Sequence, residues 1–198
     1  MKNSGIVLKN YLPAKHKVAI LSDNGERFDA VASDPALIAK LRPGYRITYT
    51  LSLGSYFAKL ANVEIIFVPK AVNYDNLQFL HQVLELCVLA IPEGQIASEV
   101  IDLLKLLSNS DTNSWAASRR RLFVGCFLGL LGFYPELEPD EYELVCSMSK
   151  ISMITVVEFI DFKIDQDLDN LLTRWIVNFV NTNVSPQQVS RFTTVYQR

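Results

Sequence analysis

The sequence predicts an α+β protein, with an N-terminal β-barrel domain over residues 1–70 and an all-helical domain over residues 71–198. Two observations support this prediction. Apolar residues alternate along much of the first 70 positions, as in strands, and recur at helical spacing afterwards. The charge changes sign at the same place, because residues 1–70 hold ten Lys or Arg against five Asp or Glu, whereas the remainder holds nine against 16. The two regions therefore carry +5 and −7, which sum to the −2 of the whole chain.

Three strands are expected within the first 32 residues, and a tight turn joins the last two. Apolar residues begin a strand near Ile6, a second strand is expected over residues 18–21, and a third over residues 27–32. Between the last two, Asn24 and Gly25 form the dipeptide that readily supplies the positive φ angles of a two-residue turn. The sequence therefore predicts a β-hairpin at this point.

A short helix and two longer strands complete the barrel domain. Asp34 is placed to accept amide hydrogen bonds at a helix N-cap, Pro35 suits the first helical position, and Pro43-Gly44 ends the helix. Residues 45–53 then alternate between apolar and polar side chains, and residues 56–68 form another β-rich stretch. Five strands with a helix between the third and the fourth match an OB-fold β-barrel.

Helical spacing of apolar residues begins after Pro69. The pattern predicts helices within residues 77–87, 96–107, 115–135 and 168–179, and it allows helices over residues 139–148 and 151–160. Residues 108–114 form a polar linker. Ser185, followed by Pro186 and then by Gln188, has the pattern of a capping box, so a final short helix is expected to begin there.

The residues form no coherent catalytic constellation, so an enzyme is not expected. The two histidines, His16 and His81, fall in different predicted domains, and a nucleophile–histidine–acid arrangement would have to cross the domain boundary. Three glycines, Gly125, Gly129 and Gly132, lie in a predicted helix rather than in a strand-to-helix loop, which excludes a phosphate-binding loop. No cofactor is therefore expected.

A metal site is not expected either. The sequence has no Cys-x-x-Cys pair. Asp165, Asp167 and Asp169 have the spacing that begins a calcium loop, but Asn170 stands at the glycine position and Ile176 at the glutamate position. Carboxylates at the start of a helix, where they favour the positive end of the dipole, explain these acids instead.

Cysteine usage and the apolar runs indicate a cytoplasmic protein. The three cysteines lie far apart, and their odd number cannot form a closed disulfide set, so a reducing compartment is expected. Residues 1–17 mix lysines with apolar residues and do not form a secretory signal. The apolar run over residues 122–133 is 12 residues long, whereas a bilayer span needs about 20. No membrane segment is therefore expected.

The basic barrel domain is a candidate nucleic-acid-binding module. Basic residues could line a groove that follows the phosphate backbone, and tyrosines could offer stacking surfaces, which is the combination that single-strand binders use. The basic residues are Lys9, Lys15, Lys17, Arg27, Arg42 and Arg46, and the tyrosines are Tyr11, Tyr45, Tyr49 and Tyr56. Core packing is expected for Tyr45 and Tyr49, which share a face with Ile47. A solvated surface without a ligand is the alternative for the lysines.

A second candidate site begins at Arg121. This residue stands just before an apolar stripe that contains Phe123, Phe127 and Leu131. A cation at the edge of a hydrophobic groove would suit a peptide that ends in an aromatic residue and a free carboxylate. The alternative is a core helix with a solvated basic start, and the residue chemistry alone favours this alternative.

Over essentially its whole length, the chain resembles the RecO family, the bacterial recombination mediators of the RecF pathway, and three segments carry this resemblance. Residues 5–8, Gly-Ile-Val-Leu, followed by the hairpin at Gly25, are similar to the family's N-terminal OB strands. Residues 79–86, Phe-Leu-His-Gln-Val-Leu-Glu-Leu, are similar to its first long helix. The run from Arg121-Leu122-Phe123 through Leu128 and Leu131 to Gly132-Phe133 resembles the family helix that ends in Leu-Gly-aromatic.

This resemblance implies a function and partners. It implies an OB-fold that binds single- and double-stranded DNA, promotes annealing and works with RecR in a nucleoid-associated, cytoplasmic repair pathway. It also implies a helical domain that docks the acidic C-terminal tail of the single-stranded DNA-binding protein. The tail-binding role would fall on the arginine and apolar residues of one helix, which are Arg121, Phe123, Phe127, Leu128 and Leu131.

The chain also departs from the family pattern. Ser33-Asp34-Pro35 replaces the basic loop that commonly follows the third strand, and the cysteine cluster of the zinc-bearing relatives is absent. The favoured hypothesis is a non-enzymatic DNA repair and recombination mediator. The alternative is a non-enzymatic interaction scaffold on the same fold with little DNA affinity, and a small hydrolase or transferase ranks below both.

Overall fold

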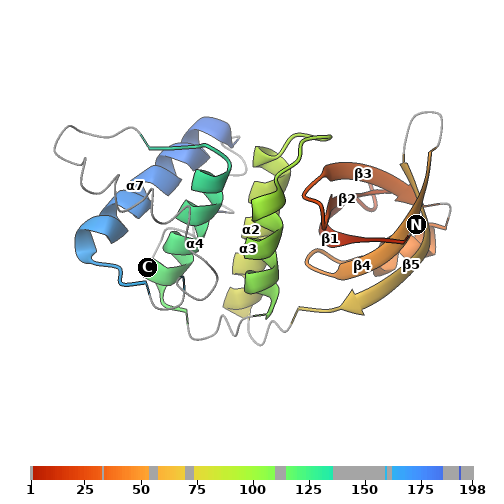
Figure 1. The fold of residues 1–198 in the computed structure, drawn as a ribbon, viewed down its shortest axis with the longest axis horizontal. Coiled ribbons are helices and arrows are strands. Elements are labelled where there is room, and N and C mark those ends of the chain that lie inside the picture. Colours follow the sequence, from red (N-terminus) through yellow and green to blue (C-terminus); the bar gives the residue numbers. More distant parts are fainter. Residues whose placement is uncertain are drawn as a thin grey trace. The chain divides into compact units, whose positions relative to one another are not determined.

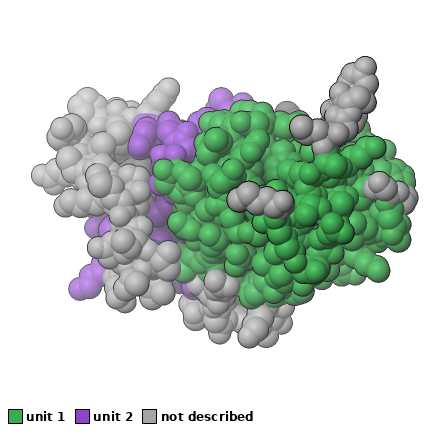
Figure 2. Space-filling view, turned by 45° about the vertical axis from the view of Figure 1, so that its right-hand side comes forward, with its two compact units in different colours: residues 1–110 green, residues 111–198 purple. Residues whose placement is uncertain are grey.

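The computed structural model describes residues 2–32, 34–53, 58–69, 74–109, 115–135, 159, 162–184 and 192. The chain divides into two compact units, residues 1–110 and residues 111–198, which Figure 2 shows in separate colours. The predicted barrel domain ended at residue 70. The compact units instead divide at residue 110, because two helices that follow the barrel pack with it in unit 1.

Five strands close into a barrel in the order β1-β2-β3-β5-β4. The β3–β5 pair is parallel, and the other four pairs are antiparallel. A short helix, α1 (Pro35–Lys40), lies between β3 and β4. The prediction of a five-stranded N-terminal barrel followed by helices is therefore confirmed (Figure 1). The strands are β1 (Asn3–Asn10), β2 (Lys17–Ser22), β3 (Arg27–Ala32), β4 (Arg46–Leu53) and β5 (Ala58–Phe67).

Alternation along the strands fills the barrel interior with apolar side chains. Val18, Ile20 and Ala30 from β2 and β3 face Ile47 and Tyr49 from β4, and all five are at most 1% exposed. The predicted hairpin is present, with Gly25 at φ +85°. The predicted cap is also confirmed, since Oδ1 of Asp34 accepts a hydrogen bond from the Ala36 amide at 2.8 Å.

Two helices cover part of the outer wall of the barrel within unit 1. These are α2 (Tyr74–Ala90) and α3 (Ser98–Asn109), and α2 packs against β1 (Figure 1). Side chains that point away from the barrel interior on β1 and β2 are consequently buried: Ile6, Ala19 and Leu21 are 0% exposed. This burial makes the barrel and both helices one packed body.

The connection between α2 and α3 pairs with the β2–β3 hairpin. The Gly94 amide donates to the Arg27 carbonyl at 2.7 Å, and the Arg27 amide donates to the Gln95 carbonyl at 3.0 Å. A Cβ added to Gly25 would lie 2.4 Å from the Ser98 amide nitrogen. Glycine is therefore required at this turn for its positive φ and for the close approach of α3.

Unit 2 is built around α4 (Ala117–Leu130) and α7 (Gln166–Asn183), which pack against each other. Gly125 permits their close approach, because a Cβ there would lie 2.5 Å from Cδ2 of Leu172. Asp165 caps α7 by accepting the Leu168 amide at 2.8 Å, which confirms the helix-start interpretation for this acid. Apart from Phe159, the helices expected over residues 139–148, 151–160 and from Ser185 fall outside the described residues.

Candidate nucleic-acid interface

The register of the barrel strands brings basic residues into one transverse row. Val31 on β3 pairs with Lys17 on β2 and with Lys59 on β5, and paired residues share a face of a sheet. The row faces outward, because Ala30 beside it belongs to the core. Neighbouring strands lie about 4.8 Å apart, so the backbones of Lys17 and Lys59 are about 10 Å apart. We call Lys17, Val31 and Lys59 the cationic row.

The loop between β1 and β2 extends this charged surface. Lys15 and His16 in this loop are exposed, as is Lys59. Within the described part of the chain, no carboxylate lies within 4.0 Å of the ammonium groups of Lys15 and Lys59. These two lysines can therefore meet phosphate groups without first breaking an ion pair.

Tyr11 stands at the edge of the cationic row between two lysines. The Nζ atoms of Lys9 and Lys17 lie 5.6 and 4.7 Å from the centre of its ring. Burial raises the pKa of the Tyr11 phenol above its usual value, so the ring stays neutral at physiological pH. This side chain holds two cations near one point and is not a free stacking surface.

Two carboxylates partly neutralise these cations. Nζ of Lys17 donates a short hydrogen bond to Asp29, whose side chain is only 4% exposed. That bond raises the pKa of Lys17, which keeps the ammonium charged. Nζ of Lys9 lies 3.7 Å from Oε1 of Glu85 on α2. The surface therefore combines free and internally paired lysines.

The end of α1 adds cations next to the same loop. Nδ2 of Asn10, at the end of β1, donates to the carbonyl oxygens of Ile38 and Leu41 at 2.7 and 3.0 Å. These bonds fix the last turn of α1 beside the start of the β1–β2 loop. Lys40 and Arg42 are exposed at this point. Of the predicted DNA-binding residues, Lys9, Lys15, Lys17 and Arg42 thus lie around one end of the barrel.

The expectation that Arg27 lines an exposed groove is wrong. This residue is only 9% exposed. Its guanidinium donates to the carbonyl oxygens of Val88 and Ile91 at the end of α2, and Nη2 lies 3.7 Å from Oδ1 of Asp29. Arg27 therefore fastens α2 to the barrel wall, and its charge is used inside the protein.

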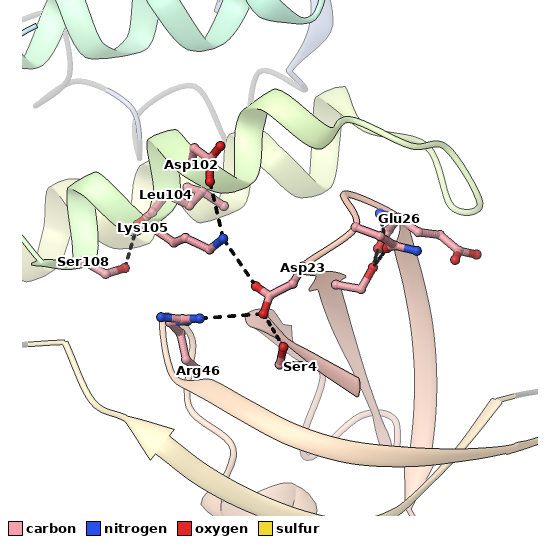
Figure 3. A network of polar contacts seen from close by, with 10 residues as sticks. Ser4, Asp23, Glu26, Arg46, Asp102, Leu104, Lys105 and Ser108 are labelled. Atoms are coloured by element: carbon pink, nitrogen blue, oxygen red, sulfur yellow. Dashed lines mark hydrogen bonds and ion pairs between the residues drawn. The ribbon is translucent and has the colours of Figure 1, made fainter. Parts of the chain in front are cut away.

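Arg46 also has an internal role. Nη2 of Arg46 lies 3.7 Å from Oδ2 of Asp23, and Nζ of Lys105 on α3 lies 3.8 Å from Oδ1 of the same carboxylate. The Ser4 hydroxyl donates to Asp23 as well. Figure 3 shows these groups converging from β1, the hairpin, β4 and α3. Arg46 is thus part of a polar network that joins the barrel to α3.

The predicted peptide site on α4 is occupied by the protein's own core. Arg121 is 8% exposed, and its Nε and Nη2 donate to the two carboxylate oxygens of Asp169 at 2.7 and 2.6 Å. Phe123, Phe127 and Leu128 are at most 1% exposed, whereas Leu131 is half-buried. The expectation of an accessible guanidinium at a groove is wrong. The alternative of a core helix is confirmed, but its solvated basic start is not, because Arg121 is buried and paired and Arg119 donates to the Phe159 carbonyl.

The tyrosines proposed for stacking are mostly unsuited to it. Tyr49 is 1% exposed and Tyr45 packs against the barrel core, as predicted for both. Tyr56 falls outside the described residues.

Lys59 is the surface residue that sequence reasoning missed. It belongs to the cationic row only because β3 and β5 pair in parallel. Alternation along a single strand does not indicate which other strand it will pair with.

The described residues contain no group of three His, Cys, Asp or Glu side chains placed to hold a metal ion. Nor does this part of the chain include a helix long and apolar enough to cross a membrane. Neither a family model nor a curated protein matches the sequence.

Proposed function

We propose that the barrel is an OB-fold that binds single-stranded DNA, and that the chain is a non-enzymatic recombination mediator of the RecO kind. Support for the OB assignment comes from the strand order, the parallel β3–β5 pair and the position of α1 between β3 and β4. OB-folds bind oligonucleotides on the face of their second and third strands, flanked by the β1–β2 loop. The cationic row crosses this face, and this observation carries the proposal.

The proposal includes RecR and the tail of the single-stranded DNA-binding protein as partners, on the sequence resemblance. The tail would need a site other than the buried Arg121 pair. Unit 2 has a cavity of about 330 Å³, whose described lining includes Phe133, Trp175 and Phe179. Aromatic walls suit an apolar end residue. This cavity equally favours the second candidate function, an interaction scaffold without useful DNA affinity.

Reversing the two unpaired lysines tests the DNA site. We expect Lys15→Glu/Lys59→Glu to weaken binding of a labelled single strand by at least about tenfold, or 1.4 kcal/mol, in fluorescence anisotropy. Losing two phosphate contacts should also make the slope of log K, where K is the association constant, against the logarithm of the salt concentration shallower by about 1.4. Both side chains are exposed, so the fold should be retained, which circular dichroism checks.

The matched control is Lys163→Glu/Arg174→Glu, which makes the same change in net charge at exposed positions of unit 2. Its affinity for the single strand should stay near that of the wild type. An equal loss of affinity in both double variants would show that binding depends only on net charge. An unchanged affinity in Lys15→Glu/Lys59→Glu would favour the alternative function, an interaction scaffold with little DNA affinity.

A further inference from the structure

A second row of paired residues lies beside the cationic row on the outer face of the barrel, and it ends at α2. On the outer face of the barrel, Lys9 of β1 pairs with Ala19 of β2, and Ala19 pairs with Asp29 of β3. This second row lies two residues along β2 from Lys17. Ala19 is completely buried, whereas the Lys9 side chain is 37% exposed. Lys9 therefore stands at the border between the wall that the helices cover and the wall that they leave open.

The two carboxylates at this border differ in burial. The Asp29 side chain is 4% exposed and contacts both Lys17 and Arg27, so it belongs to the framework of unit 1. The Glu85 side chain is 20% exposed and its Oε1 is 3.7 Å from Nζ of Lys9, a distance beyond that of a direct hydrogen bond. A phosphate group can compete for Lys9 at such a pair, because partly exposed ion pairs contribute only about 1 kcal/mol or less.

We infer that Glu85 on α2 limits the DNA affinity of the barrel by competing with phosphate groups for Lys9. Lys9 and Lys17 both approach the ring of Tyr11, so a strand that lies along the cationic row passes within reach of Lys9. The Glu85 carboxylate repels the phosphate at that point and holds the ammonium group. This inference rests on the proposed function and adds to it an acidic residue, contributed by a helix, that sets the binding strength.

The test uses the full chain with Glu85→Gln. Release of Lys9 adds one phosphate contact, so the variant should bind a labelled single strand more tightly than the wild type at low salt. The slope of log K against log salt should become steeper by about 0.7, so the gain should shrink about 2.6-fold between 50 and 200 mM salt.

Asp75→Asn is the matched control, because it removes the same charge from an exposed position on the same helix. Ten residues separate Asp75 from Glu85, which is about 15 Å along a helix, and this exceeds the Debye length, which is about 14 Å at 50 mM salt and about 7 Å at 200 mM. The control should bind like the wild type. Adding Lys9→Gln to Glu85→Gln should remove the gain.

Three results would overturn the inference while leaving the proposed function intact. The first is an unchanged affinity for Glu85→Gln, the second is an equal gain for Glu85→Gln and Asp75→Asn, and the third is a gain that persists without Lys9. A wild-type protein that shows no salt-dependent binding would instead remove the proposed function and this inference together.

Discussion

Replacing Arg121 with Glu is expected to destabilise unit 2 by at least about 4 kcal/mol. Removing one partner of a buried ion pair costs about 3–5 kcal/mol, and the new carboxylate would also face Asp169 with the same charge. The Arg121 and Asp169 side chains are only 10% and 19% exposed, so water screens this repulsion weakly. Such a loss is a large part of the 5–15 kcal/mol that typically stabilises a domain.

Tryptophan emission during urea unfolding reports this effect selectively. The chain has two tryptophans, and both Trp115 and Trp175 belong to unit 2. Lys163→Glu, the same charge change at an exposed position, should leave the unfolding midpoint nearly unchanged. Exchanging the charges in Arg121→Glu/Asp169→Arg should restore part of the lost stability. A wild-type midpoint for Arg121→Glu alone would mean that Arg121 is solvent-accessible, and would restore it as a candidate for binding an acidic tail.

Replacing Arg27 with Met is expected to destabilise unit 1 by about 3 kcal/mol. The carbonyl groups of Val88 and Ile91, at the end of α2, would lose their hydrogen-bond donor. Asp29 would also lose one of its two cationic partners. Methionine retains much of the aliphatic packing, so the change reports mainly the polar contacts. Arg42→Met, at an exposed position, is the control and should change the stability by less than about 0.5 kcal/mol.

Alkylation of Cys87 measures the opening of unit 1. This thiol is completely buried in unit 1, and burial raises its pKa well above the usual range, so it reacts only when the structure opens. Burial also raises the pKa of Cys126, in unit 2, to about 12. With Cys126 and Cys146 replaced by alanine, Arg27→Met should speed alkylation about 100-fold, since each 1.4 kcal/mol is tenfold. Equal rates in Arg27→Met and Arg42→Met would contradict the fastening role of Arg27.

Local signals in the sequence predicted the barrel well. The Asn24-Gly25 turn, the Asp34 cap and the strand over residues 45–53 each depend on neighbouring residues, and the structure confirms all three, although Leu51 at the far end of the strand is 41% exposed. Five strands and the position of the short helix then predicted the barrel. The extent of unit 1 was not predicted, because it depends on the packing of α2 against a strand more than 60 residues away in the sequence.

Non-local partners decided which basic residues remain exposed. Arg27 and Lys17 both point outward from adjacent strands, but only Arg27 meets the end of α2, 61 residues later in the sequence. Arg121 has the sequence context of a solvated helix start, yet its partner Asp169 follows 48 residues later. Composition and periodicity contain no information on such pairings, so they identified a basic region but not its accessible surface.

The salt dependence of single-stranded DNA binding by the wild-type protein tests the central claim most directly. The unpaired Lys15 and Lys59 would supply two phosphate contacts at about 0.7 each, so log K should fall against log salt with a slope of about −1.4, or more steeply if Lys40 and Arg42 also bind or if phosphate displaces Asp29 from Lys17. A titration between 50 and 200 mM salt measures this slope. A slope near zero, or no measurable binding at 50 mM salt, would contradict the assignment of the barrel as a DNA-binding surface.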